Sequence, residues 1–311
     1  MLAGLGRFEE ALGPPLEKSL EKEPENYNLW LQKGLILLDT GKLEPAIDAF
    51  ENAARLNPDN ETCWMNMGFA LYSLESYEEA LEAFKEGLRL NPPYLETGWN
   101  RKGIVLGKLG KTGEALEAFE EAIKLRPDFE DAWKNRGLLL FASEECEKAE
   151  EAFAEVLKIN PEDIDSLYNR GGISLLKLGR KETALEYLEK VVSLRPDYPD
   201  LSYSLGVALT ELGEYEKALE TFEKLASENP YDLEIQCRRG KLAMEVGNYE
   251  TALQAFERIL TEKPASREAW YRKGLALLKL ENFEEAVKAF DAVATKDADY
   301  EDAGVLKALP R

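Results

Sequence analysis

A 34-residue period runs through most of this 311-residue chain and constrains its fold more than any other feature. Glycine recurs at spacings of 34 or 35 residues, at Gly34, Gly68, Gly103, Gly137, Gly172, Gly206, Gly240 and Gly274. A sequence that repeats at this length builds one small unit many times, and each unit buries its apolar surface against its neighbours. We therefore expect a stack of eight units, which sets aside the two domains suggested by the length alone.

Other residue types keep a fixed distance from each glycine. All five tryptophans lie four residues before one, and an alanine and then a phenylalanine follow it by 12 and 16 residues, with Leu188 replacing the phenylalanine once. Trp99, Gly103 and Leu106 have the offsets of one helix face, and Ala115, Phe119 and Ala122 repeat these offsets. Each unit therefore reads as two amphipathic helices of about 14 residues, each about 21 Å long.

The ends of these helices are marked by glycine and proline. Glycines such as Gly110 and Gly213 suit a left-handed turn between the two helices, and a proline column ends the second helix. Two spacings are 35, and we expect the extra residue in the loops from Pro92 to Trp99 and from Pro161 to Tyr168. A glycine within a helix costs about 0.5–1 kcal/mol relative to alanine, so the glycine column indicates close approach of another helix.

These columns resemble the tetratricopeptide repeat, over about residues 27–300. The resemblance implies an all-α fold, a right-handed α-α superhelix of stacked antiparallel helix pairs, with first helices lining a concave groove. We expect a partial repeat or cap over 1–26 and a short capping helix over 301–311. The eight units are expected at 27–60, 61–95, 96–129, 130–164, 165–198, 199–232, 233–266 and 267–300.

The composition excludes several classes of function. The chain has no histidine, which removes Ser-His-Asp and Cys-His catalysis and imidazole metal sites. Its three cysteines are far apart, which indicates a reducing compartment and a cytoplasmic location. A net charge of −21 argues against binding of nucleic acid. We also expect no membrane span and no secretory signal. We predict no catalytic residue, no metal, no cofactor and no enzyme activity.

The resemblance implies that partners bind to first-helix positions on either side of each glycine. First helices carry +4 in total and the rest of the chain −25, so we expect a mildly basic groove wall. Our hypothesis is an extended partner segment with acidic and apolar side chains; the alternative is that the basic residues pair with neighbouring acids within the stack. The candidate residues are Asn66, Phe69, Asn100, Arg101, Ile104, Lys108, Lys134, Asn135, Leu138, Asn169, Arg170, Ile173, Lys177, Arg238, Lys241 and Arg272.

Three roles suit such a chain. The first is a non-catalytic scaffold or adaptor that binds a partner protein or peptide in the groove. The second is a substrate-recruiting subunit, or a fragment of a larger enzyme such as a glycosyltransferase, because Asn66, Asn100, Asn135 and Asn169 partly resemble the groove asparagines of O-GlcNAc transferases. The third is a homo-oligomer formed through the end faces of the stack.

Overall fold

The computed structural model describes residues 15–198 and 200–294, and within these ranges the chain is helical without strands. A short helix of residues 15–22 precedes the helix pairs. The helices that follow are α2 (Tyr27–Asp39), α3 (Leu43–Leu56), α4 (Glu61–Ser73), α5 (Tyr77–Arg89), α6 (Leu95–Lys108), α7 (Thr112–Leu125), α8 (Glu130–Ala142), α9 (Cys146–Ile159), α10 (Ile164–Leu176), α11 (Lys181–Leu194), α12 (Leu201–Leu212), α13 (Tyr215–Glu228), α14 (Leu233–Glu245), α15 (Tyr249–Glu262), α16 (Arg267–Lys279) and α17 (Phe283–Ala294).

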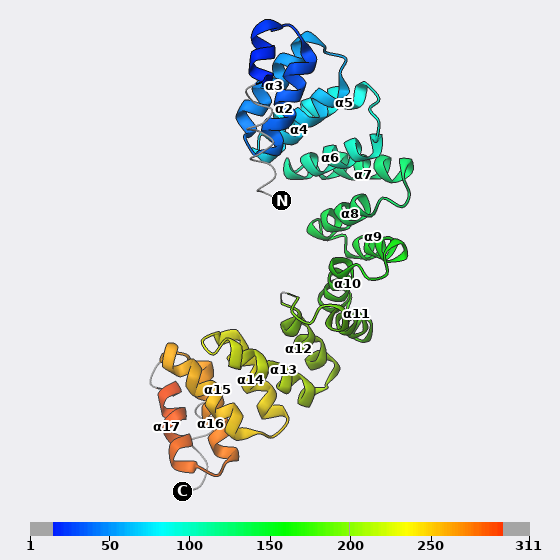
Figure 1. The fold of residues 1–311 in the computed structure, drawn as a ribbon. Coiled ribbons are helices and arrows are strands. Elements are labelled where there is room, and N and C mark those ends of the chain that lie inside the picture. The colour runs from blue at the N-terminus through cyan, green and yellow to red at the C-terminus, as the bar shows by residue number, and fades with distance from the viewer. Residues whose placement is uncertain (1–14, 199, 295–311) are drawn as a thin grey trace. The chain divides into compact units, whose positions relative to one another are not determined.

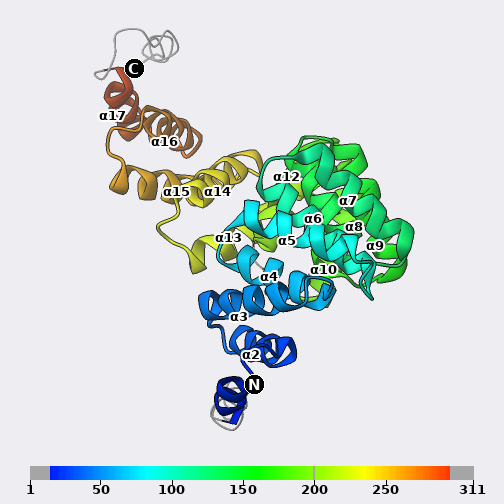
Figure 2. The same cartoon turned by 90° about the horizontal axis from the view of Figure 1, so that it is seen from above.

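The chain divides into two compact units, Met1–Ser166 and Leu167–Arg311, which we call unit 1 and unit 2. In unit 1, α2 packs on α3, α4 on α5, α6 on α7 and α8 on α9, and the second helices α3, α5 and α7 also contact the next first helix (Figure 1). First helices touch as well, as α2 with α4, α4 with α6 and α6 with α8. In unit 2 the same order continues, with α14 on α15 and α16 on α17 (Figure 2). The all-α stack of helix pairs is therefore confirmed, whereas the sequence did not predict the division within α10.

In seven of the eight helix pairs, the repeat glycine makes room for the phenylalanine of its own pair. A Cβ on Gly103 would lie 2.6 Å from the Phe119 ring, and one on Gly274 would lie 2.5 Å from the Phe290 ring. The phenylalanines in turn are buried, and alanines such as Ala115 surround them. The close approach expected from the sequence is therefore confirmed, and the group that approaches is an aromatic side chain.

The fifth glycine differs from the prediction by one residue. A Cβ on Gly171 would meet Leu188 Cγ at 3.0 Å, whereas one on Gly172 would meet nothing within 4 Å. The packing glycine of α10 is therefore Gly171, and the column that placed Gly172 there is wrong. The sequence offers two adjacent glycines at this point, and only the packing of α10 on α11 distinguishes them.

The extra residue of this repeat also lies elsewhere. The loop from Asn160 to Asp163 has the same length as the loop from Arg126 to Phe129, so it holds no insertion. The turn between α10 and α11, residues 177–180, has four residues where the turn between α6 and α7 has three. Hydrogen bonds from Leu178 N to Ile173 O (3.1 Å) and from Arg180 N to Ser174 O (2.8 Å) close this wider turn.

The other predicted loop features are confirmed. The loop between α5 and α6 holds five residues, and Tyr94 at its end has φ of 62°. The turn glycines Gly110 and Gly213 have φ of 73° and 80°, as a left-handed helix end requires. Where the turn has no glycine, Glu75, Glu144 and Glu281 take up the same backbone conformation, at φ between 59° and 63°.

The tryptophans connect each first helix to the loop before it. The indole N–H of Trp64 donates to the carbonyl of Pro58 (2.8 Å), and Trp30, Trp133 and Trp270 make the same bond to the proline six residues earlier. Gln236 makes this bond in its repeat, through Nε2 to Pro230 O at 3.2 Å. The rings also pack against the core clusters, so the tryptophan column is structural.

The two expected terminal caps lie mostly outside the described residues. Of the predicted cap over 1–26, the structure describes residues 15–26, which include the short helix at 15–22. The predicted capping helix over 301–311 lies wholly outside the described ranges.

Candidate functional site

In unit 1, the neighbouring first helices α4, α6 and α8, together with Phe84 of α5, line an open cavity of about 240 Å³. Four predicted site residues line it, namely Phe69 from α4 and Asn100, Arg101 and Ile104 from α6. The other lining residues are Tyr72, Phe84, Thr97, Phe129 and Asp131. The cavity therefore has an apolar, aromatic floor with a few polar groups, as small binding sites in proteins commonly do.

Arg101 is the cation of this cavity. Its guanidinium carbon lies 5.1 Å from the centre of the Phe69 ring, a cation–π arrangement. Burial lowers the pKa of the Arg101 guanidinium from its ordinary value. Among the described residues no ion pair involves Arg101, although Asp131 lines the same cavity. Arg101 is thus a partly desolvated charge that packs on an aromatic ring without a bonded carboxylate.

Apolar side chains flank Arg101 on both neighbouring helices. Phe69 on α4 is 40% exposed and Leu138 on α8 is 48% exposed, and Ile104 lies half-buried between them on α6. All three follow their repeat glycine by one residue, and all three are among the predicted site residues. An exposed apolar strip across three adjacent helices offers contact area to a partner.

Two of the predicted asparagines join neighbouring helices. Asn135 Nδ2 on α8 donates to Asn100 Oδ1 on α6 at 3.1 Å, and Asn100 is only 6% exposed. Asn66 Nδ2 instead donates to the carbonyl of Thr62 in its own helix at 2.7 Å. Asn100 and Asn135 therefore form a bridge beside the cavity, and Asn66 does not belong to it.

The two lysines of this face differ in their surroundings. Lys134 Nζ lies 2.6 Å from Glu130 Oε1 and 2.6 Å from Asp163 Oδ1, so its charge is neutralised within the stack. Lys108, at the end of α6, is exposed, and it takes part in no ion pair among the described residues. Lys134 follows the pairing alternative, whereas Arg101 and Lys108 stay available to an outside anion.

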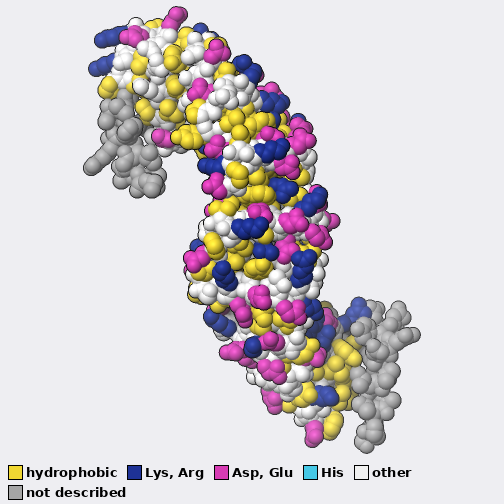
Figure 3. Space-filling view, turned by 90° about the vertical axis from the view of Figure 1, so that its right-hand side faces the viewer, with side chains coloured by type: hydrophobic (Ala, Val, Ile, Leu, Met, Phe, Trp, Pro, Cys, Tyr) yellow, Lys and Arg dark blue, Asp and Glu magenta, His cyan; other side chains and the backbone are white. Residues whose placement is uncertain are grey.

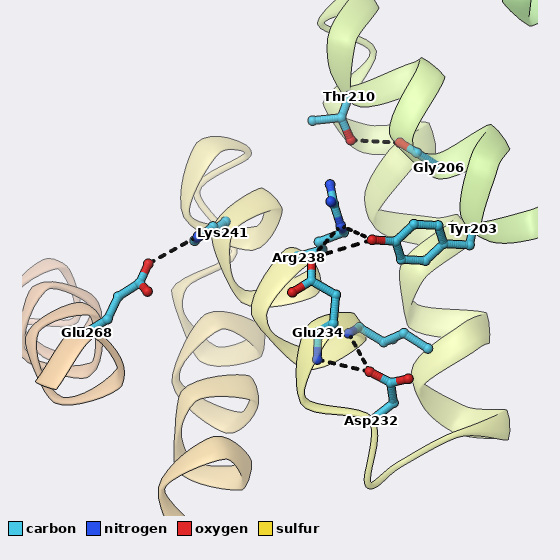
Figure 4. A network of polar contacts seen from close by, with 9 residues as sticks. Tyr203, Gly206, Thr210, Asp232, Glu234, Arg238, Lys241 and Glu268 are labelled. Atoms are coloured by element: carbon cyan, nitrogen blue, oxygen red, sulfur yellow. Dashed lines mark hydrogen bonds and ion pairs between the residues drawn. The ribbon is translucent and has the colours of Figure 1, made fainter. Parts of the chain in front are cut away.

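The first helices of unit 2 hold a network of polar contacts that Figure 4 shows. Arg238 Nε lies 2.8 Å from Tyr203 Oη and 3.0 Å from Glu234 Oε1. Tyr203 Oη also donates to Glu234 Oε1 at 3.4 Å. The Arg238 guanidinium lies over the Tyr203 ring as well, at 5.1 Å.

Two further predicted cations of this face share one carboxylate. Glu268 Oε1 lies 3.1 Å from Lys241 Nζ and 2.9 Å from Arg272 Nε. Hydrogen bonds from Lys241 and Arg272 lower the pKa of Glu268 and outweigh its partial burial. The predicted cations Arg238, Lys241 and Arg272 are thus all paired, as the alternative interpretation of the sequence proposed.

The shifted register of α10 changes the surroundings of four predicted residues. Ile173 is 2% exposed and lies in the core, so it offers no surface to a partner. The Arg170 guanidinium lies 4.5 Å from the Tyr187 ring of α11, the second helix of its pair. Asn169 is half-buried, and Lys177 is exposed in the turn after α10. The expected groove position of Ile173 is wrong because the column was counted from Gly172.

The sequence analysis missed four residues of these faces. Asp131, Glu234 and Glu268 each lie six residues before a repeat glycine, and Tyr203 lies three before Gly206. Both positions belong to the groove-lining set that the family resemblance implied. The prediction rested on basic and apolar side chains, and these four residues belong to neither class.

Charges of both signs are intermingled on the face shown in Figure 3. Pairs one turn apart on second helices, such as Lys85 with Glu82 and Lys124 with Glu121, account for part of this. Within the described ranges, no cluster of cysteine or acidic side chains suits a metal ion. None of the helices there is long and apolar enough to cross a membrane.

Comparison with solved structures gives similar folds. YrrB, described as a tetratricopeptide repeat protein with an unusual peptide-binding site, is 26% identical, with 63% of this chain and 96% of YrrB covered and a TM-score of 0.51. MamA from Desulfovibrio magneticus RS-1 is 27% identical over 56% of this chain and 97% of its own, with a TM-score of 0.51. A tetratricopeptide repeat protein from Parabacteroides merdae is 21% identical over 79% and 96%, with a TM-score of 0.55, and shows the fold alone.

The family comparison covers most of the chain. The tetratricopeptide repeat family matches residues 2–61, 31–94, 100–164, 169–232 and 237–301. A comparison with curated proteins gave no significant match. Together with the glycine, alanine and phenylalanine packing of each helix pair, the match shows that this chain belongs to the tetratricopeptide repeat family, a general protein-interaction fold.

Proposed function

We propose that the protein is a non-catalytic scaffold whose first-helix face in unit 1 binds an extended segment of a partner protein. The observation that carries this proposal is the cavity between α4, α6 and α8, in which Arg101 packs on Phe69 without a carboxylate partner. An acidic side chain of the partner supplies the missing anion, and an apolar side chain covers Phe69 and Leu138. The peptide-binding site described for YrrB supports this type of ligand.

The electrostatics of unit 2 restrict the proposal to unit 1. Binding a carboxylate at Lys241 or Arg272 requires separation from Glu268, which both already contact. Arg101 needs no such exchange, so the net gain from an incoming carboxylate is larger there. We therefore place the acidic part of the partner in unit 1.

The non-catalytic part of the proposal has two supports. The chain has no histidine, and among the described residues the carboxyl groups with shifted pKa values, Asp163, Glu268 and Glu285, are all shifted downward. A general acid near neutral pH needs an upward shift instead. The three cysteines are free, in keeping with the proposed cytoplasmic location.

Affinity capture from the source organism tests the scaffold role. We expect a protein captured by the wild type to be lost from the double variant Arg101→Gln, Leu138→Ser. Both side chains lie at the face rather than in the core, so circular dichroism should stay unchanged. The matched control is Lys124→Gln on α7, an exposed lysine paired with Glu121. Retention by the double variant, or loss with the control, contradicts the proposal.

A further inference from the structure

The first helices of unit 1 concentrate their available positive charge on one element. Helix α4 contains no lysine or arginine, and α2 and α8 pair Lys33 with Glu17, Lys134 with Glu130, and Arg136 with Glu120. On α6, Lys102 lies over the Trp99 ring at 4.4 Å and borders a pocket with carboxylates of α7. Within the part of unit 1 that the structure describes, Arg101 and Lys108 are therefore the first-helix cations that neither pair with acid nor face a second helix.

Arg101 and Lys108 share one face of α6. They are seven residues apart, which is about two helical turns and places them about 10.5 Å apart along the axis. Seven steps at 3.6 residues per turn leave them only about 20° apart around the helix. Ile104 lies between them along the helix axis, and the exposed Phe69 and Leu138 lie on the neighbouring helices α4 and α8.

An extended peptide matches this spacing in one regular conformation. A polyproline II segment rises about 3.1 Å per residue and repeats its direction every third residue, so residues i and i+3 lie about 9.3 Å apart on one side. In a β-strand, residues i and i+3 point to opposite sides. The same-side residue i+2 lies about 3–4 Å too close to residue i to match the separation of Arg101 and Lys108, and i+4 lies about 3–4 Å too far away. The two intervening residues of the polyproline II segment point sideways, toward α4 and α8.

We propose that the unit 1 face recognises a partner segment in polyproline II conformation that runs along α6 and carries two acidic residues three positions apart with an apolar residue between them. One carboxylate pairs with Arg101 and the other with Lys108, while the apolar side chain contacts Ile104 and either Phe69 or Leu138. This inference rests on the proposed function and adds the spacing, the conformation and the path of the ligand. Asp131, an exposed acid that lines the same cavity, works against it.

Fluorescence anisotropy with labelled nine-residue peptides tests the spacing. The probe holds two glutamates three positions apart around a leucine, in a background of serine and proline. Control peptides have the same composition with the glutamates adjacent or six apart. We expect the probe to bind the full-length protein about fivefold or more tighter than either control, since only it engages both cations.

Variants of the protein test the path along α6. We expect Arg101→Gln and Lys108→Gln each to weaken binding of the probe by about tenfold, because each removes one hydrogen bond between charged groups. Replacing one glutamate of the probe by glutamine should weaken wild-type binding but not binding to the variant that lacks its partner cation. Asp131→Asn should tighten binding, and Lys124→Gln should leave it unchanged.

The outcomes separate this inference from the proposed function. If the three peptides bind alike, or Lys108→Gln has no effect while Arg101→Gln does, the spaced pair along α6 is wrong and the unit 1 face still stands. If the probe fails to bind but a captured partner still depends on Arg101 and Leu138, only the further inference is overturned. If neither depends on Arg101, both proposals fail.

Discussion

At the scale of single residues, an alanine substitution in α10 distinguishes the two glycines that could face α11. Gly171 and Gly172 are adjacent, but only Gly171 faces Leu188. Alanine at Gly172 should raise the free energy of unfolding by about 0.5–1 kcal/mol, because a helical glycine is replaced where space is open. Alanine at Gly171 should give a less stable protein than alanine at Gly172, because its Cβ crowds the leucine. Urea denaturation of both variants measures the difference.

Gly103→Ala serves as the reference for a full clash, since its Cβ would lie 2.6 Å from the Phe119 ring. Overpacking of this kind costs about 1–3 kcal/mol. If Gly172→Ala proves the more damaging variant in α10, the register is the one that the periodic sequence suggested, and the packing described for α10 is incorrect.

The cysteines differ in reactivity because they differ in burial. Burial raises the pKa of the Cys63 thiol to about 12, against the opposing effect of a backbone hydrogen bond at Ala54. The thiol itself donates to Phe50 O at 2.9 Å. The thiolate is the reactive form, so Cys63 is expected to stay unmodified. Iodoacetamide at pH 8 followed by peptide mass spectrometry should label the half-buried Cys237 well before Cys63. Equal labelling in the folded protein contradicts this.

At the scale of elements, Asp163 connects α8 to the first turn of α10. Its Oδ1 lies 2.6 Å from Lys134 Nζ, and its Oδ2 accepts from Ser166 N at 2.9 Å. Burial acts to raise the pKa of Asp163, but the hydrogen bonds from Lys134 and Ser166 outweigh it, and the pKa is lowered. The same contacts raise the pKa of Lys134 against its own burial. The pair therefore holds its charges in the folded state.

The direction of these shifts sets the pH dependence. A carboxyl with a lowered pKa stabilises the fold above its unfolded pKa of about 3.9 and loses this contribution as the pH falls through the folded value. Asp163→Asn keeps a group that caps α10, yet it should lower the free energy of unfolding at pH 7. The difference in the free energy of unfolding between the variant and the wild type should narrow below about pH 4. Urea denaturation of both proteins at pH 7 and below about pH 4 measures this difference.

The matched control for this pair is Glu121→Gln, which removes an exposed partner of Lys124 on α7. Exposed pairs contribute little, so no pH-dependent gap of this size is expected. A constant gap between Asp163→Asn and the wild type across the whole range would show that the carboxylate charge has no part in stability.

At the scale of the whole molecule, stability is local because helices contact their neighbours in order. Within unit 2, α12 packs on α13, α13 on α14 and α14 on α15. Phe222→Ala removes a fully buried ring from α13 and should cost roughly 3–5 kcal/mol. Hydrogen exchange should speed up in α12 to α15 and stay unchanged in α2 to α7. Faster exchange throughout the chain would contradict nearest-neighbour stability.

Much of this architecture follows from local rules that a sequence displays directly. The repeat of Gly103 with Phe119 predicts two helices that pack closely, because only a residue without a Cβ admits the ring. Turn residues such as Gly110 and Gly213 mark left-handed helix ends, for the same steric reason. These features depend on residues within one helix pair, and periodicity therefore exposes them.

The tertiary structure alone decided which side chains of neighbouring helices each cation contacts. Arg101 and Arg238 both lie two residues before a repeat glycine, yet Tyr203 of α12 bonds Arg238 while Arg101 packs on Phe69 of α4. It also decided that Gly171 rather than Gly172 faces Leu188. These contacts and the register depend on side chains that come from neighbouring helices, so they are settled only when the helices pack against each other.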